Sequence, residues 1–250
     1  MKVYFVGAGP GDPELLTVKA ERLLKNCEIC IYAGSLVSEQ VLDLLPRDAE
    51  RHDSSALDLQ EISQLFIDAS DRGIDVVRLH SGDPAIYGAI GEQMDELDRH
   101  GIDYEVIPGI SSFQASAAAL RTELTAPEIA QTIILTRTSG RTPLPETQEL
   151  EILARTRATL CIFLSAHKIG EISDTLAKHY GEHCPAAVIY RVSWPDQQII
   201  RGTLADIGEK SSIAGIKKTA MVIVGHALAK GVPYSKLYSP EFSHEYRIGK

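Results

Sequence analysis

The sequence predicts an α/β protein with two α/β domains, of which the first has a mainly parallel sheet and the second a mixed sheet. Three observations lead to this prediction. Short apolar runs rich in β-branched and aromatic residues alternate with segments of helical period along most of the chain. Residues 121–128 contain a proline and no clear period, which is typical of a domain boundary. The 250 residues are enough for two hydrophobic cores.

The first domain is expected over residues 1–120 and begins with a strand at 3–6. Thr17 is a suitable N-cap for the helix that follows. Apolar side chains at helical spacing predict a longer helix over 58–72. The other strands are expected at 29–32, 75–79 and 104–107, and the other helices within 36–45, at 90–100 and at 111–120. This alternation is typical of a parallel sheet that is covered on both faces.

After the first domain, a linker is expected at residues 121–130, a second domain at 131–230 and a polar tail at 231–250. The sequence Ser-Trp-Pro-Asp at 193–196 predicts a turn between strands at 186–190 and 198–202. Such a hairpin is antiparallel, so the second sheet is expected to be mixed. The other strands are expected at 132–136, 158–164 and 219–224, and the helices at 149–156 and 168–180. The tail is interpreted as a segment that lies on a partner.

The net charge of −9 argues against nonspecific binding to nucleic acid or to an anionic membrane. No apolar run approaches the roughly 20 residues that cross a bilayer. Four cysteines without a recognisable secretion signal favour a cytoplasmic location. Cys27 and Cys30 lie at the start of a predicted strand and are expected to be buried. His179, His183 and Cys184 have no second ligand cluster beside them, so no metal site is expected.

A glycine-rich turn at residues 7–13 follows the first strand, and its glycines allow a ligand to approach the backbone closely. A dinucleotide-binding turn would require glycine at positions 7, 9 and 12, but Asp12 occupies the last of these. Pro10 and Pro13 also lack the N–H groups that would bind a phosphate. The turn therefore predicts a small ligand that is not a phosphate.

Two more turns, at 81–84 and 108–112, also follow predicted strands. Ligands of an open parallel sheet bind at the carboxyl ends of its strands. Glycine and proline at one strand end are explained by chain reversal alone, whereas three such ends favour a binding site. Asp12 and Asp83 favour a ligand that offers hydroxyls, amines or positive charge, such as a nucleoside with a sulfonium and an amino-acid tail.

The three turns resemble the ordered signatures of a known family. Val-Gly-Ala-Gly-Pro-Gly-Asp-Pro at 6–13, Ser-Gly-Asp-Pro at 81–84 and Ile-Pro-Gly-Ile-Ser-Ser at 107–112 are similar to those of the tetrapyrrole (class III) S-adenosylmethionine methyltransferases. The similarity extends to about residue 228. Within that family, the chain resembles the C-11 methyltransferases of cobalamin synthesis, which act on precorrin-4 or cobalt-precorrin-4. That closer resemblance lies in residues 32–37, 135–146, 190–196 and 235–244.

The resemblance implies the tetrapyrrole methylase fold, a homodimer, and a cleft between the two domains that binds S-adenosylmethionine and releases S-adenosylhomocysteine. The tetrapyrrole substrate would lie in an adjoining trough. Leu164 stands where relatives often have Met, Val192 where some have Gly or Ala, and Ser81 where Gly is common. Carried over position by position, the cofactor contacts fall on Pro10, Ser81, Gly82, Asp83, Ile86, Ser111, Ser112, Leu164, Val192, Ala220 and Met221.

The acetate and propionate arms of such a substrate are anions, so a protein of net charge −9 needs local arginines to bind them. Arg137 and Arg141 lie in a polar loop and are the candidates, although the same loop could be solvated or close on the dimer partner. His80 and Tyr87 flank the second glycine turn and are candidates for the trough, with ordinary packing or turn hydrogen bonds as the alternative.

Methyl transfer from a sulfonium disperses charge, so a water-excluding site that aligns donor and acceptor is expected to suffice without a catalytic triad or a metal. No catalytic base is identified. The alternative activities are methylation of another tetrapyrrole position, as in uroporphyrinogen III, and, more distantly, diphthine synthesis. A non-catalytic tetrapyrrole carrier is the alternative outside the enzymes, and Pro10 and Asp12 disfavour a nicotinamide dehydrogenase. The sequence does not distinguish a substrate with cobalt from one without it.

Overall fold

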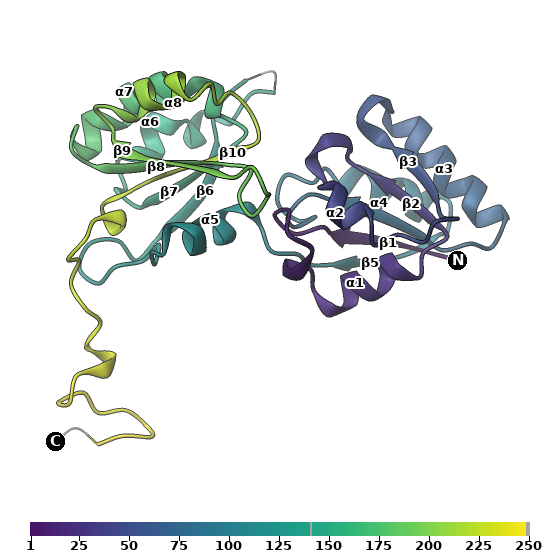
Figure 1. Cartoon of the computed structure of the whole chain (residues 1–250), viewed down its shortest axis with the longest axis horizontal. Helices are drawn as coiled ribbons and strands as arrows, with labels where there is room; N and C mark the ends of the chain where they lie inside the picture. Colours follow the sequence, from purple (N-terminus) through teal and green to yellow (C-terminus); the bar gives the residue numbers. More distant parts are fainter. Residues whose placement is uncertain (141, 249–250) are drawn as a thin grey trace. The chain divides into compact units, whose positions relative to one another are not determined.

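The computed structural model describes residues 1–140 and 142–248, which form two compact units (Figure 1). The first unit comprises Met1–Ala115 together with Arg191–Gln197, and the second comprises Ser116–Tyr190 and the residues from Gln198 on. Each unit contains one five-stranded sheet, parallel in the first and mixed in the second, which confirms the predicted fold class. No helix among the described residues is long and apolar enough to span a bilayer.

All neighbouring strands of the first sheet run parallel, in the order β3-β2-β4-β1-β5. Most residues of β1, β2 and β4 are buried, as their apolar runs predict. Strand β3 was not predicted, because its sequence Glu-Arg-His-Asp is polar and it pairs only with β2 at the edge of the sheet. The strands are β1 (Lys2–Gly7), β2 (Ile29–Tyr32), β3 (Glu50–Asp53), β4 (Val76–His80) and β5 (Asp103–Ile107).

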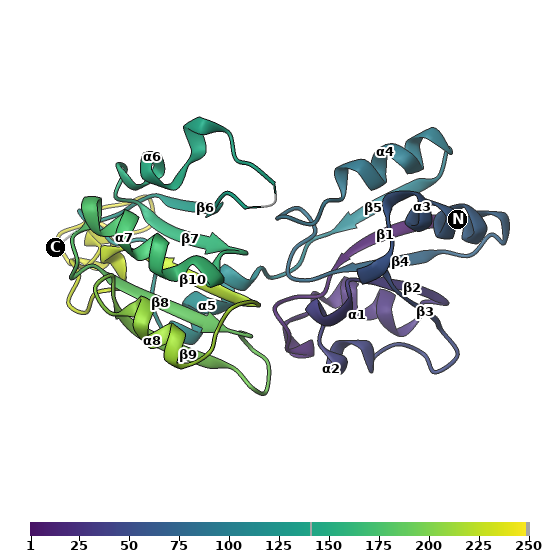
Figure 2. The ribbon, with the colours of Figure 1, turned by 90° about the horizontal axis from the view of Figure 1, so that it is seen from above.

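Helices cover both faces of the first sheet (Figure 2). They are α1 (Val18–Lys25), α2 (Glu39–Leu42), α3 (Leu59–Asp71) and α4 (Gly91–Arg99). The helices α1 and α2 contribute Leu24 and Val41 to the core on one face, and α3 and α4 contribute Phe66 and Leu97 to the core on the other. Thr17 caps α1 as predicted, since its hydroxyl accepts a hydrogen bond from the first helical turn at 3.2 Å.

The second sheet has the strand order β6-β7-β10-β8-β9. Strands β6 and β7 are parallel, β10 runs antiparallel to both β7 and β8, and β8 and β9 form the predicted antiparallel hairpin. The strands are β6 (Ile133–Arg137), β7 (Thr159–Phe163), β8 (Pro185–Tyr190), β9 (Gln198–Thr203) and β10 (Ala220–Val224).

Helices α6 (Leu150–Ala154), α7 (Ile169–Tyr180) and α8 (Ile207–Ile213) cover one face of the second sheet, and the second half of α5 (Ser112–Leu120) lies on the other (Figure 1). Ile172 and Leu176 of α7 pack in the core with Leu160 of β7, and all three are fully buried. Helix α8 was not predicted. It buries only Ile207 and Ser211 and has no side-chain N-cap, so its sequence lacks the two usual helix signals.

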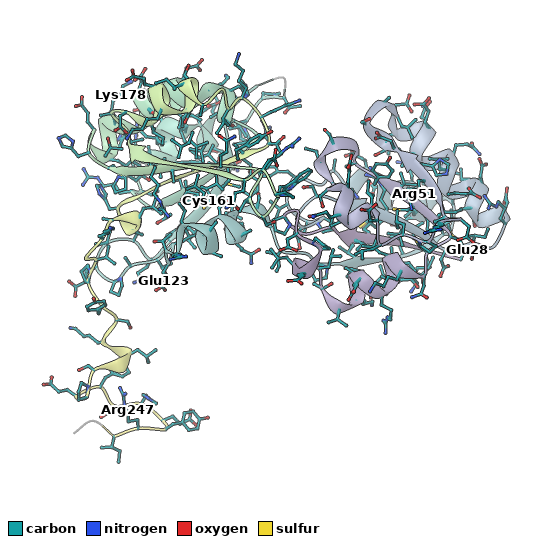
Figure 3. The ribbon with its side chains drawn as sticks, viewed as in Figure 1. Glu28, Arg51, Glu123, Cys161, Lys178 and Arg247 are labelled. Atoms are coloured by element: carbon teal, nitrogen blue, oxygen red, sulfur yellow. The ribbon has the colours of Figure 1, made fainter. Side chains whose placement is uncertain are left out.

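All four cysteines are free and buried, as predicted for Cys27 and Cys30. Burial raises the pKa of Cys161, which lies within β7 (Figure 3), to about 12, and that of Cys184 to about 12 as well. These two thiols therefore stay protonated at neutral pH. Over the described ranges, no three His, Cys, Asp or Glu side chains gather as metal ligands would.

Residues 191–197, which connect β8 to β9, group with the first unit. The boundaries predicted from the sequence assign them to the second domain. Two hydrogen bonds explain the difference: Trp194 Nε1 donates to the Pro10 carbonyl at 2.9 Å, and the Asp12 N–H donates to Ser193 Oγ at 3.0 Å. Turn chemistry predicts the hairpin but does not predict where its connecting loop packs.

The described residues after β10 contain no further strand or α-helix. The side chain of Arg247 organises this tail, because its guanidinium donates to the carbonyl oxygens of Leu237, Ser239 and Phe242 at 2.6, 2.9 and 3.3 Å (Figure 3). The contact of the tail with a partner stays a prediction.

Candidate active site

The three glycine turns of the first unit meet at the carboxyl end of its sheet. Strand β1 lies between β4 and β5, so the turns that follow these strands are neighbours. The backbones of Gly9 and Gly82 bond to each other in both directions, at 3.2 and 2.8 Å, and the Gly109 N–H donates to the Asp83 carboxylate at 2.9 Å. These turns carry the predicted site residues Pro10, Ser81, Gly82, Asp83, Ser111 and Ser112, and Ile86 follows the second turn.

The turns pack so closely that their contact requires glycine. A Cβ atom at Gly7 would lie 2.6 Å from the Cα of Gly109 and 2.7 Å from the carbonyl oxygen of Gly82. A Cβ atom at Gly109 would overlap the same oxygen. Gly82 has a φ of +65°, in the left-handed region that glycine adopts without strain. The sequence shows the glycines but not that they contact one another.

The carboxylates of Asp12 and Asp83 hold these turns in shape. One oxygen of Asp83 accepts from the Ala85 N–H at 2.8 Å and the other from the Gly109 N–H. Asp12 accepts from the Glu14 N–H at 2.9 Å and so caps a short 3₁₀ helix. Both side chains thus have a structural role that turn composition alone does not reveal. Carboxylates at two of the three turns also disfavour a bound phosphate.

A buried polar cluster lies at the end of β4, which leads into the second turn. Arg78 is 5% exposed, and its guanidinium donates to Gln93 Oε1 and to Ser54 Oγ, both at 3.0 Å. His80 is equally buried and lies beside the ring of Phe5, with ring centroids 5.9 Å apart. Burial lowers the pKa of Arg78 to about 10, so the guanidinium stays charged at neutral pH.

Burial, and to a smaller extent the Arg78 charge, lowers the pKa of His80 to about 3, so this imidazole is neutral at neutral pH. Its Nε2 has no hydrogen-bond partner in the part of the chain that the structure describes. This geometry favours the packing alternative for His80 over contact with the substrate. A pKa of about 3 also makes His80 a poor acceptor for a proton released at neutral pH.

His80 is expected to make the protein less stable at mildly acidic pH. The unfolded chain binds a proton at His80 near pH 6.5, whereas the folded chain does so only near pH 3. The contribution of His80 to stability is therefore present above pH 6.5 and is lost as the pH falls toward 3, by about 2 kcal/mol between pH 7 and pH 5. His80→Leu should lose about 2 kcal/mol less than the wild type between these pH values in urea denaturation.

Between pH 7.5 and pH 8.5 the free energies of unfolding of the wild type and of His80→Leu should change in parallel, because His80 is neutral there in both the folded and the unfolded chain. If both proteins lost the same stability between pH 7 and pH 5, the conclusion that His80 is buried in its neutral form would be wrong.

Strained backbone marks several of the predicted site positions. Nine non-glycine residues of the described chain have a positive φ. Six of them are predicted site residues or lie within two positions of one: Tyr87, Ala89, Leu164, Arg191, Ser193 and Thr219. Such conformations cost about 1–3 kcal/mol each and tend to gather at functional sites. Because none of the six is a glycine, the sequence carries no signal of this strain.

The predicted contacts Leu164, Ala220 and Met221 of the second unit lie where β7 ends and β10 begins. Leu164 directly follows β7, and Ala220 begins β10, where it pairs with Tyr190 of β8. The Leu164 side chain is 67% exposed with a φ of +55°, so it is held away from the core. The Met221 side chain is buried, which leaves mainly its backbone for a ligand.

Arg137 shapes the loop that follows β6. Its guanidinium donates to the carbonyl oxygens of Thr142 and Pro143 at 2.9 and 3.0 Å. Arg141, the other arginine expected to bind the substrate, lies outside the described residues. Substrate contacts of either side chain stay predictions, as does that of Tyr87, which is 46% exposed.

Comparison with known proteins identifies the family. The family model of the tetrapyrrole (corrin/porphyrin) methylases matches residues 2–208. The chain belongs to this family. A cobalt-precorrin-4 C(11)-methyltransferase of Methanocaldococcus jannaschii is 50% identical over 98% of this chain and 96% of its own. A precorrin-4 C(11)-methyltransferase of Pseudomonas aeruginosa is 49% identical over the whole of both chains.

Solved structures of tetrapyrrole methylases share the fold. The X-ray structure of a cobalt-precorrin-4 methyltransferase superposes with a TM-score of 0.89 and 42% identity, covering 91% of this chain and 96% of its own. A uroporphyrin-III C-methyltransferase of Thermus thermophilus, complexed with S-adenosylhomocysteine, has a TM-score of 0.76 and 30% identity, covering 95% and 99%. The family and fold predicted from the sequence are therefore confirmed.

Neither Arg78 of β4 nor Trp194, which packs on the first glycine turn of this tetrapyrrole methylase, was predicted as a site residue. Arg78 reads in the sequence as an interruption of an apolar strand, and that buried charge is the signal that could have singled it out. Trp194 is the only tryptophan of the chain, and it bonds to Pro10 across 184 residues. A tryptophan in a short hairpin turn is unusual enough to suggest a packing partner elsewhere.

Proposed function

We propose that this chain transfers a methyl group from S-adenosylmethionine to C-11 of precorrin-4 or cobalt-precorrin-4, which gives the precorrin-5 stage of cobalamin biosynthesis. The observation that carries the proposal is the similarity over the full length to two C(11)-methyltransferases, at 50% and 49% identity. The uroporphyrin-III C-methyltransferase, which represents the alternative activity, is 30% identical.

The methyl donor is proposed to bind at the three glycine turns, where the close packing leaves backbone rather than side chains on the surface of the site. Pro10 has no N–H, and carboxylates stand at Asp12 and Asp83, so the turns suit a cationic donor better than a phosphate. When bound, S-adenosylmethionine supplies an electrophilic methyl group on a positively charged sulfur. The full set of proposed contacts is Pro10, Ser81, Gly82, Asp83, Ile86, Ser111, Ser112, Leu164, Val192, Ala220 and Met221.

The site is proposed to accelerate methyl transfer by aligning the donor with the acceptor and by excluding water. The bond from sulfur to the methyl carbon would break as the new carbon–carbon bond forms, which leaves a neutral thioether and passes the positive charge to the tetrapyrrole. Because the charge is dispersed on the way, water stabilises the ground state more than the transition state. Residues 7–11 are all buried, and the backbones of Ala8 and Gly9 are bonded to His80 and Gly82, which supports a dry and rigid wall on this side of the site. A rigid wall aligns donor and acceptor without an activating base.

Binding of the carboxylate arms of the tetrapyrrole is assigned to Arg137 and Arg141, and Tyr87 is kept as a further candidate contact. The guanidinium of Arg137 holds the carbonyl groups of Thr142 and Pro143, so this side chain is proposed to act on the substrate by shaping that part of the loop as well as by its charge. His80 is less suited to direct contact because it is buried.

The test is incubation of the purified protein with precorrin-4, with and without cobalt, and with S-adenosylmethionine labelled with ¹³C in its methyl group. The expected product carries one new methyl carbon, which NMR assigns to C-11. A methyl group at another position would favour the uroporphyrinogen-type alternative. A bound but unmethylated tetrapyrrole would favour the carrier. The protein is also proposed to be a cytoplasmic homodimer, and light scattering on the same sample checks the dimer as a species of twice 27.3 kDa.

A further inference from the structure

The loop 191–197 packs directly on the first glycine turn. Trp194 Nε1 donates to the carbonyl oxygen of Pro10 at 2.9 Å, and the N–H of Asp12 donates to Ser193 Oγ at 3.0 Å. Between these two bonds lies Gly11, where an added Cβ atom would overlap the indole ring of Trp194. The turn is therefore in contact with the loop at three successive residues.

Interactions within the loop 191–197 also hold its shape. The guanidinium of Arg191 lies 4.8 Å from the centre of the Trp194 ring and pairs with Asp196 at 2.8 Å. The N–H of Ser193 donates to Gln197 Oε1 at 2.7 Å. Arg191 and Ser193 have φ values of +42° and +66°, which non-glycine residues adopt only when the surroundings enforce them. These contacts hold the indole in one orientation.

The first glycine turn needs such external support. The bonds to Gly82 hold Gly9, and the Gly11 carbonyl accepts from Ser38 Oγ, but neither interaction involves the peptide group between Pro10 and Gly11. Gly9 and Gly11 have φ values of +67° and +152°, and glycine can adopt many other conformations. Pro10 lies between them and has no N–H, so its carbonyl is the one backbone group through which its orientation can be held by a hydrogen bond. That carbonyl is bonded to Trp194.

We propose that Trp194 is a positioning residue for the methyl donor: it holds the Gly9–Gly11 turn in the single conformation that binds S-adenosylmethionine. The inference rests on the proposed function, in which Pro10 contacts the donor. Trp194 acts through Pro10 and Gly11 rather than on the reacting atoms.

This role predicts a specific kinetic pattern. When a turn exists in several conformations, the apparent Kd equals the intrinsic Kd divided by the fraction of molecules in the competent one. If removal of the indole lowers that fraction to about a tenth, the Kd for the donor rises about tenfold. Saturating donor restores the competent conformation, so kcat stays within about twofold of the wild type while KM for the donor rises.

Three variants separate the contributions of the loop. Trp194→Phe keeps an aromatic ring against Gly11 but loses the hydrogen bond to Pro10, and should raise the Kd for S-adenosylhomocysteine about threefold. Trp194→Ala loses both and should raise it about tenfold or more. Ser193→Ala removes the acceptor of the Asp12 N–H and should have an effect close to that of Trp194→Phe. Calorimetry gives each Kd, steady-state kinetics give KM and kcat, and thermal denaturation shows that each variant is folded.

The wild type offers an independent readout, because Trp194 is the only tryptophan of the chain. Binding of S-adenosylhomocysteine next to Pro10 should change the tryptophan emission with the Kd found by calorimetry. A folded Trp194→Ala variant with an unchanged Kd would overturn the inference alone. A lower kcat at an unchanged Kd would also overturn it, because a merely structural defect acts in that way. Absence of any binding to the wild type would instead overturn the proposed function.

Discussion

Replacing Gly7 with alanine is expected to weaken binding of S-adenosylhomocysteine by about a hundredfold or more, which corresponds to about 3 kcal/mol. The new methyl group would lie 2.6 Å from the Cα of Gly109 and 2.7 Å from the carbonyl oxygen of Gly82. Both contacts are to backbone, which moves only if the turns at Gly82 and Gly109 separate. Isothermal calorimetry measures the loss of affinity, and thermal denaturation should show an accompanying loss of stability of about 1–3 kcal/mol.

Gly91→Ala is the matched control in the same unit. Gly91 is the first residue of α4, and an added Cβ atom there meets nothing within 4 Å. Alanine favours a helix over glycine by up to about 1 kcal/mol, so this variant should bind the ligand normally and be at least as stable as the wild type. Normal binding by Gly7→Ala would show that the close packing of the three turns does not form the donor site.

The sequence predicts the buried elements of the fold well because burial leaves a pattern in the residue types. The run at 29–32 is β2 without any change of bounds, and the helix predicted over 58–72 from its apolar spacing is α3, Leu59–Asp71. Strand β3 and helix α8 leave no such pattern. The first is an edge strand of polar residues, and the second is a short helix that buries two side chains. Their positions are set by neighbours that are distant in the sequence.

In the candidate site too, contacts between residues that are distant in the sequence could not be predicted. The three glycine turns could be recognised as a group because parallel strands end at one edge of a sheet. What each residue does there depends on contacts that no local pattern encodes. Asp83 bonds to Gly109, 26 residues away, and Trp194 bonds to Pro10, 184 residues away. The meeting of the three turns could therefore be predicted from the sequence, whereas the structural roles of Asp83 and Trp194 could not.

Asp83→Ala should destabilise the first unit by about 3 kcal/mol, because it removes two hydrogen bonds to a charged acceptor. The bond from the Ala85 N–H, at 2.8 Å, is local to the second turn, and the bond from the Gly109 N–H, at 2.9 Å, joins the second turn to the third. Without them the Gly109 turn is free to move away from Gly82, so binding of S-adenosylhomocysteine should also weaken by more than tenfold. Chemical denaturation and calorimetry measure the two effects.

Two further variants test whether Asp83 acts on the turns or on the ligand. Asp83→Asn keeps one acceptor oxygen and should recover part of the stability. Asp12→Ala removes a single bond, to Glu14, and should cost about 1 kcal/mol, the usual value for a lost cap. If Asp83 acted only by touching the donor, Asp83→Ala would weaken binding and leave the free energy of unfolding unchanged. If affinity and the free energy of unfolding fall together across the Asp83 variants, the carboxylate builds the site by fixing Gly109 against Gly82.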